Sequence, residues 1–375
     1  MPDVRVVSSI HQVGRPGWDA CFPGGLEGFD YLAATEAAGL AGFEWRYVLV
    51  EEGGVLLAAA PAFFSDYDLD TTLTGFGRAL VAASRRIAPR AFTVRLASLG
   101  SPCTDDIGLG FHPDVLSVQK PGLMRLMEQA FRRAAADAGC WLLALKDAPD
   151  QDGLWADLAW GAGYQGSPGM PNAELAIDFP DMDAYFARLS PGVRKDMRRK
   201  LRASMDLRIE RRRDIVGLED RILELYRQTR SRSELQFEEL TSAYFTGVLA
   251  GMGERSSCML YYAGDELLAF NLLLHDEERL VDKFFCMETT GGRAHNLYFV
   301  SWFTNVSLCL EEGLRCYQSG QAGYETKLKL GSQLTPTHTY FRHRRRLVNQ
   351  ALRWAAPLLA DDPVPPHSRA SGVPA

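Results

Sequence analysis

The sequence has no run of eighteen apolar residues, so it offers no helix that would cross a membrane. Its seven cysteines form no CxxC pair and no His/Cys spacing typical of structural zinc. The first residues, MPDVRVVSSIHQVG, lack the basic and apolar stretches of a secretory signal. From these absences we expect a cytoplasmic protein with reduced cysteines, no metal and no stable membrane insertion.

Charge is unevenly distributed along the chain. The formal net charge of −6 argues against a dedicated nucleic-acid binder. The segment 190–214, however, contains ten Lys or Arg and four Asp or Glu. An acidic protein with one strongly basic segment is predicted to bind an anionic ligand there.

The 375 residues predict two domains, separated near Asn172 in a loop rich in Gly and Pro, 161–174. Each half has the same order of predicted elements: a hairpin, a long helix and a strand. These are 45–64, 123–139 and 140–147 in the first half, and 258–274, 298–313 and 314–319 in the second. We interpret the order as an internal repeat of one α/β unit. The last residues, 346–375, are predicted to be a terminal helix and a disordered tail.

Four strings resemble one known group of proteins. They are WDACFPGGLEGFDYLAATEAAG, LSPGVRKDMRRKLRAS, HNLYFVSWFTNVSLCLEEGLRCYQSG and GQAGYETKLKLGSQLTPTHTY. Over roughly residues 10–345 the chain is thereby similar to tandem-domain members of the GNAT acyltransferase superfamily, in the group of Fem-type aminoacyltransferases and peptidogalycan biosynthesis/recognition proteins. The resemblance implies an α/β (α+β) fold with two tandem GNAT-like domains, 1–172 and 173–345. Each would be a mixed, largely antiparallel sheet flanked by helices.

The basic segment begins with a helix that Ser190 and Pro191 start. Its cations fall on adjoining stripes of that helix: Arg194, Lys195, Arg198, Arg199, Lys200 and Arg202. We predict that Arg194, Arg198 and Arg199 bind phosphates of the donor, whether coenzyme A, a tRNA end or a lipid-linked pyrophosphate. The alternative is a solvated face whose charges pair with acids.

A second phosphate-binding candidate precedes the long helix of the second half. GNAT proteins that bind coenzyme A typically have a glycine-containing loop there, whose N–H groups hold the pyrophosphate. This sequence reads GGRAHNLYF, with glycines before Arg293 and none after it. We predict that Gly291, Gly292 and Arg293 approach a phosphate. The alternative is a plain connection in which Asn296 caps the helix.

The segment SGQAGYETKLKLG, 319–331, is the main catalytic candidate. Its glycines follow a strand without a clear helix start, so we predict an active-site segment and not a phosphate-binding loop. If the segment is extended, Glu325 and Lys327 share a face. Glu325 would accept a proton from the amine, Lys327 would stabilise negative charge, and Tyr324 would protonate the leaving group. The alternative is a surface hairpin with an ordinary salt bridge.

Two weaker candidates complete the set. His338 is predicted to be a further catalytic residue, because histidine titrates near neutral pH. The pair Asp105 and Asp106 could suggest a metal, but two adjacent acids are too few ligands, so we predict no metal site.

These patterns predict an acyltransferase of the GNAT type. It would move an acetyl or longer acyl group from acyl-CoA to a small-molecule or peptide amine by direct attack, since no GxSxG motif or Cys–His pairing indicates a covalent intermediate. One alternative is a Fem-type enzyme that takes an aminoacyl group from tRNA and acts on a peptidoglycan-like peptide. Another is a non-catalytic cell-wall or ligand-binding module. The oligomeric state stays open.

Overall fold

The computed structural model describes residues 2–68, 93–149, 153–233 and 236–350. These residues divide into two compact units. Within the described ranges the first unit contains the chain up to 170, 236–239 and 336–350, and the second contains 171–233 and 240–335.

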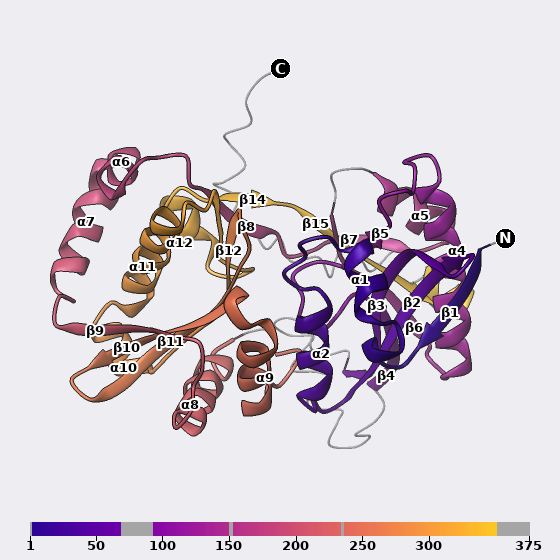
Figure 1. Ribbon diagram of the computed structural model, residues 1–375, viewed down its shortest axis with the longest axis horizontal. Coiled ribbons are helices and arrows are strands. Elements are labelled where there is room, and N and C mark those ends of the chain that lie inside the picture. The colour runs from indigo at the N-terminus through magenta and orange to yellow at the C-terminus, as the bar shows by residue number, and fades with distance from the viewer. Residues whose placement is uncertain (1, 69–92, 150–152, 234–235, 351–375) are drawn as a thin grey trace. The chain divides into compact units, whose positions relative to one another are not determined.

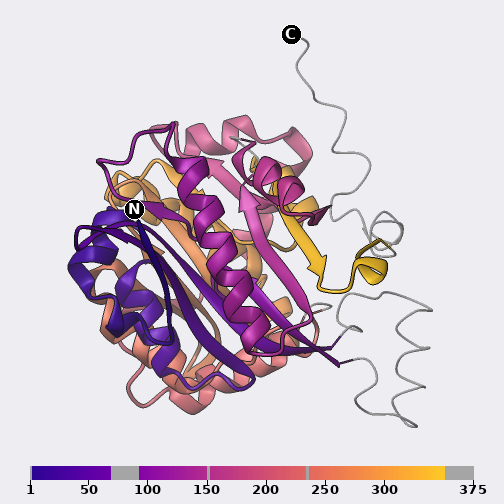
Figure 2. The same cartoon turned by 90° about the vertical axis from the view of Figure 1, so that its right-hand side faces the viewer.

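The first unit is built on a mixed sheet with the strand order β1-β2-β3-β4-β6-β15-β7, and β5 pairs with β3. The strands are β1 (Asp3–Val7), β2 (Phe43–Glu52), β3 (Val55–Asp68), β4 (Thr93–Leu99), β5 (Gly110–Phe111), β6 (Leu142–Pro149), β7 (Gln165–Pro168) and β15 (Thr337–His343). The helices are the short turn Ile10–Gln12, α1 (Arg15–Cys21), α2 (Phe29–Ala37), α4 (Lys120–Asp137) and α5 (Leu154–Gly161). Helix α4 lies across this sheet and contributes Met127 and Phe131 to its core (Figure 2).

The second unit has a sheet of the order β14-β8-β13-β12-β11-β10-β9. The strands are β8 (Asn172–Ala176), β9 (Leu207–Arg212), β10 (Ser256–Ala263), β11 (Glu266–His275), β12 (Arg279–Met287), β13 (Cys316–Gln318) and β14 (Gln333–Thr335). The helices are α6 (Met182–Arg188), α7 (Pro191–Arg202), α8 (Glu219–Arg230), α9 (Ser242–Met252), the turn Gly253–Arg255, α10 (Thr289–Ala294), α11 (Leu297–Glu312) and α12 (Tyr324–Lys329). Figure 1 shows α11 against this sheet, with α6 and α7 on the outer side of the helix.

The two units repeat one topology. In the first unit the hairpin β2–β3 and strand β4 lead through α4 to β6, which is parallel to β4. In the second unit the hairpin β10–β11 and strand β12 lead through α11 to β13, which is parallel to β12. The internal repeat predicted from the order of elements is therefore present in the fold.

The repeat is completed by a reciprocal exchange of strands. Strand β8 follows β7 in the chain but pairs with β13 of the second unit. Strand β15 follows β14 but pairs with β6 and β7 of the first unit, and its Tyr340 is buried in that unit's core. The predicted C-terminal domain, 173–345, therefore differs from the structure. The free edge of β6 takes up 337–343 as its antiparallel neighbour, a long-range pairing that no local pattern encodes.

A chain of buried hydrogen bonds connects α11, α6 and α12. Trp302 Nε1 donates to Tyr185 OH (2.9 Å), and Tyr185 OH donates to the carbonyl of Leu330 (2.7 Å). All three residues are buried. The chain thereby fixes the C-terminal end of α12 against the core of the second unit.

Tyr185→Phe is expected to destabilise the second unit by about 1–3 kcal/mol, because it leaves the Trp302 indole and the Leu330 carbonyl buried without a partner. Urea unfolding would measure the change in the free energy of unfolding. Tyr262→Phe is the control, since Tyr262 is a buried tyrosine that takes no part in this chain of bonds. Equal stability of the two variants would contradict the prediction.

None of the described helices is long and apolar enough to span a membrane. All seven cysteines lie within the described residues and are free thiols. Burial raises the pKa of the Cys21 and Cys140 thiols to about 11.

Candidate functional site

In the second unit the parallel strands β12 and β13 diverge after their paired residues, and the candidate site lies at this point. The two strands are paired from Arg279–Val281 to Cys316–Gln318. Beyond this point β12 continues to Met287, whereas the chain after β13 turns through Gly320 and Gly323 into α12. Both glycines have positive φ, 77° and 68°, which side chains rarely adopt. The first β12 residue past the paired part is Asp282.

Asp282 carries a buried carboxylate that is held by three donors. Its Oδ2 accepts hydrogen bonds from Asn271 Nδ2 (2.8 Å), Tyr317 OH (3.1 Å) and Asn305 Nδ2 (3.2 Å). Burial raises the pKa of this carboxyl to about 6, against the lowering effect of these hydrogen bonds and of the Lys327 charge. The group therefore changes its charge close to neutral pH.

The amide of Asn271 is itself fixed by two hydroxyls. Tyr261 OH donates to Asn271 Oδ1 (2.8 Å), and Ser301 Oγ donates to the same oxygen (3.1 Å). The network thus joins side chains from β10, β11, β12, β13 and α11. A buried polar network of this kind holds its members rigidly.

Three polar atoms of this region are buried and make no hydrogen bond among the described residues. They are Asp282 Oδ1, Asn305 Oδ1 and Tyr298 OH. Burial raises the pKa of the Tyr298 phenol, and the negative charge of Asp282 raises it further, so these two groups interact. Because buried polar groups are nearly always paired, such atoms indicate a place for a ligand or an ordered water.

Lys327 is buried beside this network, with 5% of its surface exposed. Its Nζ donates to the carbonyls of Ser319 and Gly320, the latter at 3.1 Å. Its positive charge lowers the pKa of the Asp282 carboxyl. The lysine therefore fixes the end of β13 to α12 and places a cation near the carboxylate.

The predicted pairing of Glu325 with Lys327 is wrong in its geometry. Residues 324–329 form the helix α12 and are not extended, and the helix begins directly after Gly323. Side chains two positions apart on a helix point in nearly opposite directions. Glu325 is accordingly exposed and ion-paired with Lys329 (2.6 Å), whereas Lys327 points inward. Tyr324, the first residue of α12, is buried.

The glycine pair before the long helix lies in a short helix of its own, and its predicted contact with a phosphate stays a prediction. Thr289–Ala294 form the short helix α10, in which the Gly291 N–H donates to the Glu288 carboxylate. A side chain at Gly292 would collide with Met287, so close packing explains this glycine. Arg293 is exposed. The carboxylate of Glu288 caps the N-terminus of α10. Asn296 precedes α11 in a left-handed conformation and makes no side-chain cap.

The cations of α7 are paired with acids of their own neighbourhood. Arg199 and Lys200 both contact Asp196, at 2.6 Å and 2.9 Å, and Arg198 contacts Asp183 at 3.3 Å. Arg194 donates to the carbonyl of Leu189 at 3.3 Å. The side chains of Arg198 and Arg199 stay half exposed or more, so these pairs are surface pairs of small energy.

His338 belongs to the first unit, whereas Tyr324, Glu325 and Lys327 belong to the second. It lies on β15 opposite Ala148 and Pro168, and its ring stacks on Tyr340 at 6.0 Å. Its predicted catalytic role stays a prediction.

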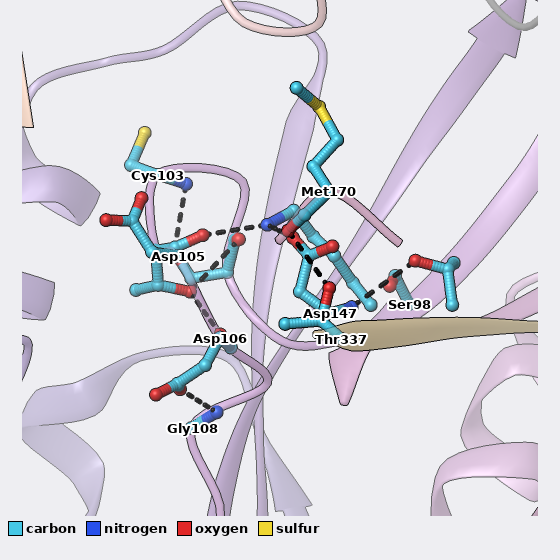
Figure 3. A network of polar contacts seen from close by, with 12 residues as sticks. Ser98, Cys103, Asp105, Asp106, Gly108, Asp147, Met170 and Thr337 are labelled. Carbon is cyan, nitrogen blue, oxygen red and sulfur yellow. Dashed lines mark hydrogen bonds and ion pairs between the residues drawn. The ribbon is translucent and has the colours of Figure 1, made fainter. Parts of the chain in front are cut away.

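A second polar cluster lies where β4 and β6 stop pairing in the first unit (Figure 3). Lys146 Nζ donates to the Thr104 carbonyl (2.7 Å) and forms an ion pair with Asp147 (2.5 Å). Asp147 has a φ of 50°, which is unusual for a residue other than glycine. The cluster occupies the place in the repeat that Asp282 occupies in the second unit.

The pair Asp105 and Asp106 lies in the loop beside this cluster. Gly108 N donates to Asp106 Oδ1 (2.7 Å), and Thr104 Oγ1 donates to the Asp106 carbonyl (2.8 Å), as Figure 3 shows. Asp106 therefore closes the loop. Among the described residues no group of three or more His, Cys, Asp or Glu could hold a metal ion.

The sequence interpretation missed Asp282, Asn271 and Asn305. Each is a single polar residue inside an apolar run: RLVDKFF, LAFNLLL and FTNVSL. Such isolated polar residues are the signal that could have identified them, because a strand or helix with two buried faces has room for them only if they are paired.

The second half of the chain is similar to a known family of proteins. A family described as "Peptidogalycan biosysnthesis/recognition", FemAB_like, matches residues 175–355. No curated protein matches the sequence.

Solved structures share the fold over most of the chain. FemX is 11% identical with a TM-score of 0.52, covering 83% of this chain and 91% of its own. The C-terminal domain of a putative lysylphosphatidylglycerol synthetase from Agrobacterium fabrum is 12% identical with a TM-score of 0.51, covering 95% and 96%. A tandem GNAT protein from the clavulanic acid biosynthesis pathway is 12% identical with a TM-score of 0.51, covering 92% and 98%.

The protein is therefore a tandem GNAT-fold protein, as the sequence predicted. The match to the FemAB_like family lies in the second half of the chain, from β8 onwards. Fold and family together support transfer of acyl or aminoacyl groups in general.

Proposed function

We propose that the second unit transfers an acyl or aminoacyl group from an activated carrier to an amine, with Asp282 as the proton acceptor. The observation that carries the proposal is the buried Asp282 carboxylate, whose Oδ1 has no partner among the described residues. A general base works best when its pKa lies near the operating pH, and burial brings the pKa of Asp282 to about 6.

The reaction is a direct displacement. The amine nitrogen attacks the carbonyl carbon of the donor ester or thioester, the C–N bond forms, and the bond to the carrier oxygen or sulfur breaks. Asp282 accepts the proton that the amine loses. The carrier atom takes a proton from a tyrosine hydroxyl, for which Tyr324 and Tyr298 are the candidates. Lys327 is a positioning residue that fixes the segment before α12 and offsets negative charge.

The donor favoured by these observations is an aminoacyl-tRNA, with the amine of a peptidoglycan-like peptide as the acceptor. The match of the second half of the chain to the FemAB_like family supports it. Acyl-CoA is the second candidate, since the GNAT fold favours it. The predicted contacts of Arg194, Arg198 and Arg199 with donor phosphates remain a proposal for either carrier.

A transfer assay with matched donors tests the proposal. The protein is expected to acylate a peptide amine from aminoacyl-tRNA and to be stabilised by that donor in thermal unfolding, because a ligand of the folded state raises the unfolding temperature. Stabilisation and turnover with acyl-CoA alone would favour the second donor. If neither donor gives turnover while a peptidoglycan fragment still binds, the protein is a binding module and the proposed transferase function is wrong.

A further inference from the structure

The second unit contains an apolar groove of about 730 Å³ that the transfer site does not use. Its lining residues come from α6, α7, β9, β10 and α11 and from the turn after α7. Most of its lining is apolar, and three of the lining side chains are methionines: Met182, Met205 and Met259. Unbranched, flexible thioether side chains adapt to ligands of irregular shape. A groove of this size and lining fits a flexible hydrocarbon chain.

The rim of the groove exposes apolar side chains to solvent. Met205 is 79% exposed and Ile209 is 40% exposed, although both line the groove. They lie on and just after the turn that connects α7 to β9. Apolar side chains exposed next to an apolar groove mark a surface that binds another apolar partner.

Cations surround this apolar surface. Arg198 of α7 stacks over Phe186 of the groove at 5.3 Å, and its side chain is 50% exposed. Arg211 also lines the groove, where it pairs with Glu312 and donates to Ser257 Oγ (3.1 Å). The acid in the lining is Glu311. The segment 190–214, which contains α7 and β9, has ten basic and four acidic residues in a chain of net charge −6, although Arg198 and Arg199 each contact an acid.

We propose that α7 and this groove form a peripheral docking site for an anionic phospholipid bilayer. The cations of α7 attract the anionic headgroups, while Met205 and Ile209 enter the interface and a single acyl chain occupies the groove. Charge complementarity selects an anionic bilayer over a neutral one. The site does not include Asp282 or Lys327 and goes beyond the proposed transfer reaction, although it shares Arg198 and Arg199 with the proposed donor contacts.

Vesicle co-sedimentation of the full chain tests the proposal without any donor or acceptor, so its outcome is independent of transferase activity. The chain is expected to bind phosphatidylglycerol vesicles at least tenfold more tightly than phosphatidylcholine vesicles, with binding that weakens as salt rises. Met205→Glu and the double variant Arg198→Glu/Arg199→Glu should each weaken binding to phosphatidylglycerol at least tenfold.

Val216→Glu is the matched control, because Val216 is 72% exposed in the same unit and does not line the groove. All these side chains are at least half exposed, so the variants keep the fold, which circular dichroism checks. Equal binding to both kinds of vesicle, no binding to either, or the same loss in Val216→Glu as in Met205→Glu would overturn the proposal. Binding of a soluble single-chain phosphate amphiphile without binding to vesicles would overturn it as well.

Discussion

Asp282→Asn is expected to abolish transfer and at the same time to stabilise the protein above pH 6. The substitution keeps an oxygen for the donors Asn271, Asn305 and Tyr317, but it removes the proton acceptor. Loss of a general base typically lowers the rate by about 10²–10⁴-fold. Steady-state kinetics with the active donor would measure kcat/KM in the variant and the wild type.

The expected gain in stability follows from the raised pKa. The pKa of Asp282 is about 6 in the folded protein against an ordinary value of 3.8. Below about pH 4 the carboxyl is protonated in both states. Between the two pKa values the unfolded state loses its proton first, so the free energy of unfolding falls as the pH rises. Above pH 6 the buried charge costs a constant amount of about 3 kcal/mol, which is an upper bound.

Urea unfolding at pH 4, 5, 6 and 8 would show this. The wild type should lose stability from pH 4 to 6 relative to Asp282→Asn, and the variant should be more stable at pH 8. Glu325→Gln is the matched control, because Glu325 is an exposed carboxylate, and it should retain both activity and the wild-type dependence on pH. If Glu325→Gln is inactive while Asp282→Asn stays active, the prediction is wrong and Glu325 is the general base.

Lys327→Met is expected to cause the largest loss of stability, about 3–5 kcal/mol. It leaves the Ser319 carbonyl without the Lys327 donor, while the Gly320 carbonyl keeps its bond from the Ala173 N–H. It also removes the cation that favours the ionised form of Asp282. The pKa of Asp282 should therefore rise, and the acid limb of the pH profile of kcat/KM should move to higher pH. A purely structural lysine would lower stability without moving that limb.

Lys329→Met provides the control for this prediction on the same helix. Its ammonium forms an exposed pair with Glu325 at 2.6 Å, so the substitution should cost at most about 1 kcal/mol. Lys327→Arg, which keeps the charge, should recover part of the shift in the pH profile. A Lys327→Met protein as stable as the wild type would contradict the buried position of this side chain.

Part of the candidate site could be predicted from the sequence. Lys327 was predicted from its residue type within the segment 319–331, and its charge lowers the pKa of Asp282; its role in catalysis stays a prediction. Its supposed partner was not correct, because the glycines that suggested an open loop start a six-residue helix. Helix formation there depends on the contact of α12 with the core, through Tyr185 and the Leu330 carbonyl, and local composition does not encode this contact.

The sequence by itself determined the two-fold repeat, because the periods of strands and helices and the order of elements are local properties of the chain. The GNAT class came from the resemblance of four strings to a known group. The tertiary structure alone decided which sheet receives β8 and β15, since the choice of a strand partner depends on a free edge far away in the sequence. It also decided that Asp282 is buried. An aspartate in a strand becomes a base of raised pKa only when a sheet and a helix close around it and exclude water.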